Sequence, residues 1–131
     1  MAKKYEGNTL SLWDIRGKEV TNYLKTREIN PDSLDCNSEI LAVRMTAGGE
    51  KIGYVTIVFQ DSKKAYIKDI FIHKKSLEHY GKKTIKYVIR YLREKDITEI
   101  ELNLENNVQK KYQNSQGLTS PILNKNVIDG I

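Results

Sequence analysis

The sequence contains only one cysteine and two prolines, and it has no long apolar stretch. Cys36 has no second cysteine to pair with in the chain, and a single thiolate rules out a zinc site built from several cysteines. No apolar run approaches the roughly 18–20 residues of a membrane-spanning helix. The first residues lack an apolar core after Lys3 and Lys4, so they do not resemble a signal peptide. These absences favour a cytoplasmic protein that does not enter a membrane.

Metal-site and nucleic-acid signatures are also missing. His73 and His79 have no surrounding pattern of cysteines or carboxylates, so no metal site is expected. The lysines are spread along the chain, and neither an RNP-like nor a helix-turn-helix signature is present. The net charge of +5, from 22 basic and 17 acidic residues, suits an anionic partner such as a nucleotide cofactor. That charge leaves nucleic acid open as a partner.

The remaining composition is typical of a folded protein. The chain has 131 residues, of which 39% are apolar and 30% charged, so we expect one domain spanning residues 1–131.

Hydrophobic periodicity predicts alternating strands and helices. The expected order is a strand at 8–15, a helix at 17–28, a loop or short helix at 30–38, strands at 39–46, 51–60 and 65–73, a helix after residue 81, a strand at 100–104, a helix at 106–116 and one or two strands within 118–131. The three central strands are joined by short turns, which allow only antiparallel pairing.

One unit in this order requires a parallel pair. The strand at 65–73 is followed by a helix whose apolar stripe is Ile85, Val88, Ile89 and Leu92, and then by the strand at 100–104. Strand, helix and strand in succession form a parallel crossover. The predicted fold class is therefore α/β (α+β), with a mixed, mostly antiparallel sheet, one parallel βαβ crossover and helices on both faces.

The turn before that helix has the chemistry of a phosphate site. We expect the helix to begin after Gly81, so that exposed backbone amides and the positive end of a helix lie beside Lys82 and Lys83. An ordinary polar loop capping a helix is the alternative.

The element order and the segment 65–73 resemble the GNAT N-acetyltransferase superfamily, most clearly over residues 39–118. The resemblance implies acetyl-CoA as co-substrate, with the pantetheine arm along the strand at 65–73 and the pyrophosphate within residues 74–84. The residues implied to bind acetyl-CoA are Ile70, Phe71, Ile72, Tyr80, Gly81, Lys82, Lys83, Thr84, Asn106 and Asn107.

The chain departs from the family pattern at two places. Glu78 stands where the phosphate loop usually has Gln or Arg, and Lys83 takes the place of a small residue. Near the end of the match, Gln113 falls on the position of the family's tyrosine, and Tyr112 lies one residue earlier. A shift of one residue rotates a side chain by about 100° around a helix.

Acetyl transfer to an amine needs a base for the amine proton, donors for the oxyanion and an acid for the leaving thiolate. Glu101 matches a position where some family members carry the base, although it also fits a solvent-facing strand carboxylate. Asp69 is a second candidate because it interrupts an apolar strand. Tyr112 is the candidate acid or else a packing residue, and the amide of Ile72 is the oxyanion donor implied by the resemblance.

The predicted function is an acetyl-CoA-dependent N-acetyltransferase that acts on an amine by direct attack. The alternative is a catalytically inactive module of the same fold, which acts through protein or nucleic-acid contacts. A stripe formed by Tyr80, Thr84, Tyr87 and Tyr91 beside the apolar face of the helix fits half-buried core and leaves room for a homodimer.

Overall fold

One mixed β-sheet runs through the whole computed structural model, which describes residues 2–34, 36–102 and 122–123. Within these residues the strands lie side by side in the order β1-β2-β3-β4-β5-β6-β7. Their bounds are β1 Lys3–Glu6, β2 Leu10–Asp14, β3 Ser38–Met45, β4 Lys51–Phe59, β5 Lys64–Ile72, β6 Glu99–Leu102 and β7 Ile122–Leu123. All neighbouring pairs are antiparallel except β5 and β6, which are parallel. The predicted mixed sheet with one parallel pair is confirmed.

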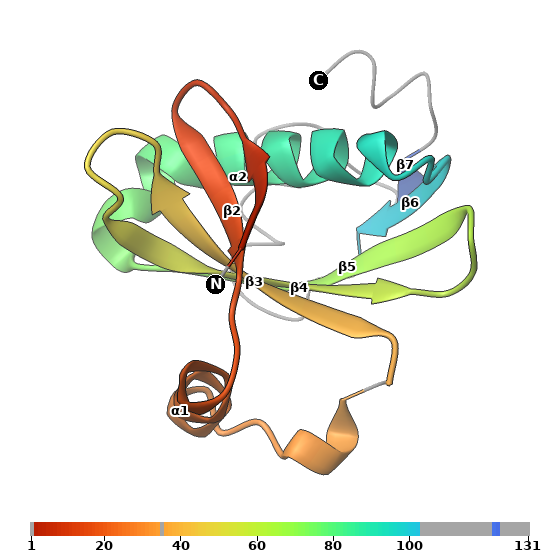
Figure 1. Ribbon diagram of the computed structural model, residues 1–131, viewed down its shortest axis with the longest axis horizontal. Helices are drawn as coiled ribbons and strands as arrows, with labels where there is room; N and C mark the ends of the chain where they lie inside the picture. Colours follow the sequence, from red (N-terminus) through yellow and green to blue (C-terminus); the bar gives the residue numbers. More distant parts are fainter. Residues whose placement is uncertain (1, 35, 103–121, 124–131) are drawn as a thin grey trace.

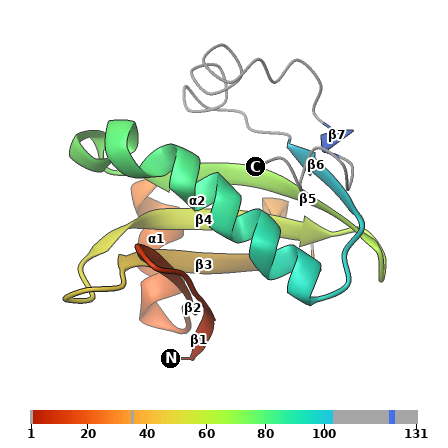
Figure 2. The same cartoon turned by 90° about the horizontal axis from the view of Figure 1, so that it is seen from above.

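Two helices cover the two faces of this sheet, as predicted. The helix α2, Lys74–Glu94, makes the crossover between β5 and β6, and α1, Lys18–Thr26, connects β2 towards β3. Figure 1 shows α2 on one face and α1 on the other, and Figure 2 shows α2 lying across the strands. A short 3-10 helix, η1, spans Pro31–Ser33 in the segment expected to be a loop or a short helix.

The face under α2 holds the apolar core. The predicted stripe of Ile85, Val88, Ile89 and Leu92 is buried there, with at most 4% of any of these residues exposed. It packs against buried side chains of the strands, among them Leu12, Val55, Ile67 and Ile100. Removing such apolar surface from water is the main stabilising contribution to folding.

The tyrosine stripe of α2 is used inside the same chain. Tyr87 and Tyr91 are buried, and the ring of Tyr87 lies 5.9 Å from that of Tyr5 on β1. The Tyr91 hydroxyl donates a hydrogen bond to Glu39 on β3. Both rings therefore belong to the core of the chain, which is one of the two roles expected for the tyrosine stripe, the other being a homodimer contact.

The structure differs from the prediction at one helix and one strand. The helix after β5 begins at Lys74 rather than after Gly81, so the predicted turn before Gly81 is wrong. Residues 74–80 contain neither glycine nor proline, and nothing in them prevents the helix from starting directly after the strand. Strand β1 was not expected, and its burial pattern shows why, since only Tyr5 of its four residues is partly buried. The predicted helix at 106–116 lies outside the described residues.

No helix in the part of the chain that the structure describes is both long and apolar enough to cross a membrane.

Candidate functional site

Strand β5 carries a β-bulge that shapes the site. Thr56 of β4 lies opposite Asp69, and the next residue, Ile57, lies opposite Ile67, so Lys68 is an extra residue in β5. Side chains normally alternate between the two faces of a strand, but a bulge interrupts that alternation. Lys68 and Asp69 consequently both line a cavity on the α1 face.

Asp69 is held by two residues of the α1 segment. Arg27 Nη1 lies 2.7 Å from Asp69 Oδ2, and the Tyr23 hydroxyl donates to the same oxygen at 3.4 Å. The two charged side chains are 21% and 15% exposed, so the ion pair is only partly screened by solvent. The Arg27 guanidinium also stacks 4.5 Å from the ring centre of Phe71. This arrangement fixes the carboxylate at the sheet surface.

Tyr23 links this ion pair to the sheet. Its ring lies 4.3 Å from that of Tyr54 and 6.3 Å from that of Phe71. Burial of the hydroxyl, followed by the negative charge of Asp69, raises the pKa of Tyr23 to about 12. Tyr23 therefore remains a neutral hydrogen-bond donor at physiological pH.

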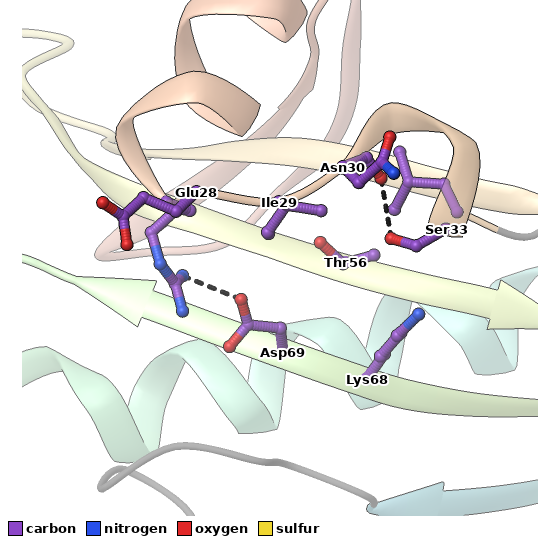
Figure 3. Close-up of a pocket in the computed structure, with 9 residues that line it drawn as sticks. Glu28, Ile29, Asn30, Ser33, Thr56, Lys68 and Asp69 are labelled. Carbon is purple, nitrogen blue, oxygen red and sulfur yellow. Dashed lines mark hydrogen bonds and ion pairs between the residues drawn. The ribbon is translucent and has the colours of Figure 1, made fainter.

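A cavity of about 480 Å³ opens beside Asp69, between the sheet and the segment joining α1 to η1. Figure 3 shows the side chains that surround it, with Asp69 and Lys68 rising from β5. Its lining consists of Arg27, Glu28, Ile29, Asn30, Ser33, Leu34, Thr56, Lys68 and Asp69. Most of these side chains are polar or charged, and Ile29 and Leu34 are the apolar members, so the lining suits a small polar molecule.

The end of α1 places Glu28 at the rim of this cavity. Ile29 N donates to Leu24 O at 2.9 Å and Glu28 N donates to Lys25 O at 3.1 Å, the hydrogen bonds of a Schellman motif. Glu28 occupies the left-handed position of this motif with a φ of 56°, where glycine is usual. The chain therefore carries a carboxylate beside the cavity at a position where glycine would be less strained.

The acetyl-CoA side of the predicted site lies where β5 meets α2. Ile70, Phe71 and Ile72 form the end of β5, and Gly53 of β4 lies opposite Ile72. A Cβ at Gly53 would meet the carbonyl oxygen of Phe71 at 2.1 Å, so the two backbones approach closely only because Gly53 lacks a side chain.

The N-terminus of α2 has the features of an anion site. His73 precedes the helix and makes no capping hydrogen bond through its side chain, and the first turn contains no acidic residue. The amides at this end therefore have no side-chain cap, and the helix dipole favours a negative charge there. This end fits a phosphate group, and it lies seven residues before the position predicted from Gly81.

The predicted phosphate residues lie further along α2. Gly81 is buried inside the helix, whereas Lys82 and Lys83 are exposed on its surface. Thr84 is fully buried and its hydroxyl donates to the carbonyl of Tyr80 at 2.7 Å. In a helix interior, backbone amides bond to the carbonyl four residues earlier, so the amides of this stretch do not form an open nest.

Glu101, the predicted base, is not among the residues that line the cavity. Glu101 lies on β6 opposite Tyr66 of β5, and Lys64 Nζ is 3.6 Å from its carboxylate. Tyr112, Asn106 and Asn107 lie outside the described residues, and their roles stay predictions. Among residues 2–34, 36–102 and 122–123, no group of His, Cys, Asp and Glu could hold a metal.

Sequence reasoning missed Arg27, Glu28, Lys68 and Tyr23 as site residues. Tyr23 and Arg27 share the apolar stripe of the predicted helix, and an arginine in such a stripe is a signal for a buried charged partner. The role of Lys68 depends on the bulge, which follows from pairing with β4 and leaves no local pattern.

Comparisons with known proteins agree with this architecture. The family described as "Acetyltransferase (GNAT) family" matches residues 9–118. FdhC, a nucleotide-linked sugar GNAT, is similar in structure with a TM-score of 0.70 at 9% identity, over 96% of this chain and 92% of FdhC. No curated protein matches the sequence.

Two bacterial acetyltransferases are also similar. A GNAT acetyltransferase from Elizabethkingia anophelis, solved with acetyl-CoA bound, has a TM-score of 0.54 at 14% identity, over 85% of this chain and 76% of its own. A GNAT acetyltransferase from Staphylococcus aureus MU50 has a TM-score of 0.54 at 15% identity, over 82% of each chain. These similarities confirm the predicted fold.

Proposed function

Because the chain belongs to the acetyltransferase (GNAT) family, we propose that it transfers an acetyl group from acetyl-CoA to an amine that binds in the cavity beside Asp69. The observation that carries this proposal is the bulge in β5, which brings Asp69 into the cavity wall directly before Ile70. An amine in the cavity then lies next to the strand that is expected to hold the pantetheine arm.

The co-substrate would be held by groups at the junction of β5 and α2. The backbone of Phe71 and Ile72 at the end of β5 suits the pantetheine arm, and the amides at the start of α2, which have no side-chain cap, suit the pyrophosphate. The exposed Lys82 and Lys83 add positive charge farther along the helix.

In this arrangement Asp69 holds and orients the amine. The amine nitrogen attacks the thioester carbonyl carbon, a C–N bond forms, the C–S bond breaks and the sulfur leaves as a thiolate. The amine proton passes to a base, for which Glu101 remains the candidate, and Tyr112 remains the candidate acid for the thiolate. Arg27 and Tyr23 act as positioning residues because they fix the carboxylate of Asp69.

A rate assay with a matched control tests the role of Asp69. Asp69→Asn should lower kcat/KM for the amine by about tenfold or more, because a charge-assisted contact to the amine is lost. The control is Asp96→Asn, which alters an exposed residue after α2 whose φ of 64° asparagine tolerates well. Equal rates for the two variants would remove Asp69 from the mechanism.

A binding-only module is the second candidate, and one observation favours it. Gly81 lies inside α2, so the backbone amides around it are in a helix interior and are not open to a phosphate. Thermal denaturation with acetyl-CoA separates the two candidates, since a ligand that binds the native state raises the melting temperature. An unchanged melting temperature at millimolar acetyl-CoA would favour the module.

Two variants locate the phosphate site in the same assay. Lys75→Glu adds a negative charge to the first turn of α2. This charge should stabilise the helix by its interaction with the helix dipole, but it should repel phosphate. The melting temperature should rise without acetyl-CoA, and the increase caused by acetyl-CoA should shrink. The double variant Lys82→Glu with Lys83→Glu tests the site predicted from sequence, and Lys63→Glu, in the exposed β4–β5 turn, is the control for added charge.

A further inference from the structure

We propose that the amine acceptor carries an anionic group, a carboxylate or a phosphate, which binds at Lys68 while its amine lies towards Asp69 and Glu28. This inference rests on the acetyl transfer proposed above and names the chemical class of the acceptor. It depends on the distribution of charge around the cavity.

Lys68 reaches the cavity because of the bulge. In a regular strand Lys68 and Asp69 would point to opposite faces of the sheet. The extra residue in β5 puts both of them into the lining of the cavity. A cation and an anion that are neighbours in the sequence thus become neighbours in one binding surface.

Of the charged side chains in the lining, Arg27 and Asp69 pair with each other, with 2.7 Å between the charged atoms, so Lys68 and Glu28 carry the charges that no ion pair among the described residues offsets. Lys68 is half-buried, and within residues 2–34, 36–102 and 122–123 it makes no hydrogen bond or ion pair. A partly desolvated ammonium without a counter-charge costs free energy, which a ligand anion would recover.

Neither carboxylate of the lining, Glu28 or Asp69, forms an ion pair with this ammonium. Figure 3 shows Glu28 at one end of the cavity, Lys68 and Ser33 at the other, and Asp69 between them. Asp69 precedes Ile70, so the carboxylate end is the end next to the expected position of the thioester. The charge pattern fixes the orientation of the acceptor, with its amine towards the thioester and its anion at Lys68.

A series of amines with one chain length tests this orientation. The probes are 4-aminobutyrate, butylamine and 1,4-diaminobutane, whose far ends are negative, neutral and positive, and 2-aminoethyl phosphate serves as a second anion. Acetyl transfer is measured as the release of free CoA thiol. We expect the anionic amines to have the highest kcat/KM and 1,4-diaminobutane the lowest.

Substitution of Lys68 should change the order of the acceptors. Lys68→Gln should lower kcat/KM for the anionic amines by about tenfold more than for butylamine. Lys68→Glu should make 1,4-diaminobutane the best of the series. Lys25→Gln, which removes an exposed cation from α1 outside the cavity lining, is the control and should leave the order unchanged.

Melting temperatures with each amine provide a readout without turnover. If amines are acetylated but their order is the same in the wild type and Lys68→Glu, the inference is overturned and the proposed function stands. If no amine is acetylated but the anionic amines raise the melting temperature only when Lys68 is present, the acceptor class stands and the transfer does not. If Lys68 affects neither readout, the assignment of the cavity is wrong.

Discussion

The two faces of the sheet differ in what their helices bury against it. Under α2 the contacts are mostly apolar, and the stripe from Ile85 to Leu92 closes a continuous core. Under α1 the contacts include two ion pairs, Arg27 with Asp69 and Lys51 with Glu19, each with 2.7 Å between the charged atoms. The α2 face therefore supplies most of the stability, and the α1 face carries fixed charges of the kind that a binding site needs.

The largest expected effect breaks the α2 face. Leu92→Ala removes a fully buried side chain from the core and should lower the free energy of unfolding by about 2–5 kcal/mol. Urea denaturation followed by circular dichroism measures this loss. Leu92→Met keeps the volume and should cost less than about 1.5 kcal/mol. A loss as small in the alanine variant as in the methionine variant would contradict the assigned role of this face.

The second effect acts where the sheet meets the site. Gly53→Ala places a methyl group against the backbone of Phe71, so it should cost about 1–3 kcal/mol and weaken acetyl-CoA binding. Calorimetric titration measures the affinity for acetyl-CoA. Gly48→Ala is the control: its φ of 86° makes alanine unfavourable, but no atom lies within 4 Å of the added Cβ. Its affinity for acetyl-CoA should stay unchanged, and a loss equal to that of Gly53→Ala would refute the local explanation.

The third effect separates stability from activity on the two faces. Glu28→Gly relieves a left-handed residue in the Schellman motif of α1 and should stabilise the fold by up to about 1 kcal/mol. The same change should lower kcat/KM for the amine because Glu28 lines the cavity.

Asp96→Gly is the matched control for that change. Asp96 follows α2 with a φ of 64°, and Ile97 N donates to Leu92 O at 3.1 Å in the same motif. The stability gain should be similar and the activity unchanged. Full activity in Glu28→Gly would show that its carboxylate serves no purpose in the cavity.

The smallest effect at neutral pH concerns the hydroxyl of Tyr23. An exposed or unfolded tyrosine ionises near pH 10, and the folded state raises the pKa of Tyr23 to about 12. The contribution of Tyr23 to stability is thus complete below pH 10 and is lost as the pH rises through about 12. Between these values the wild type should lose stability faster than Tyr23→Phe, as measured by urea midpoints at each pH. Parallel losses in the two proteins would contradict the assigned pKa.

Local patterns predicted the α2 face well. The spacing of Ile85, Val88, Ile89 and Leu92 predicted a buried helical stripe, and the succession of strand, helix and strand predicted the parallel pair. Both are confirmed, as is the assignment to the acetyltransferase (GNAT) family. These features depend on periodicity and element order, which a single sequence contains.

The site was less predictable because it depends on contacts between distant segments. The sequence marks Asp69 as an interruption of an apolar strand, but its partner Arg27 directly follows α1 and is 42 residues away in the chain. Glycine commonly marks a turn, so the sequence predicts a helix start after Gly81, whereas packing along the whole of α2 outweighs the cost of one glycine in a helix, about 1 kcal/mol. The bulge at Lys68 arises from the register between β4 and β5.

A crystal structure with acetyl-CoA bound tests the division between the two faces most directly. It should place the thioester beside Ile70–Ile72, with its acetyl group directed towards the cavity at Asp69 and the pyrophosphate at the start of α2. An acetyl group on the α2 side of the sheet would contradict the assignment of catalysis to the α1 face. A crystal that is grown at saturating acetyl-CoA but contains no bound acetyl-CoA would contradict it as well.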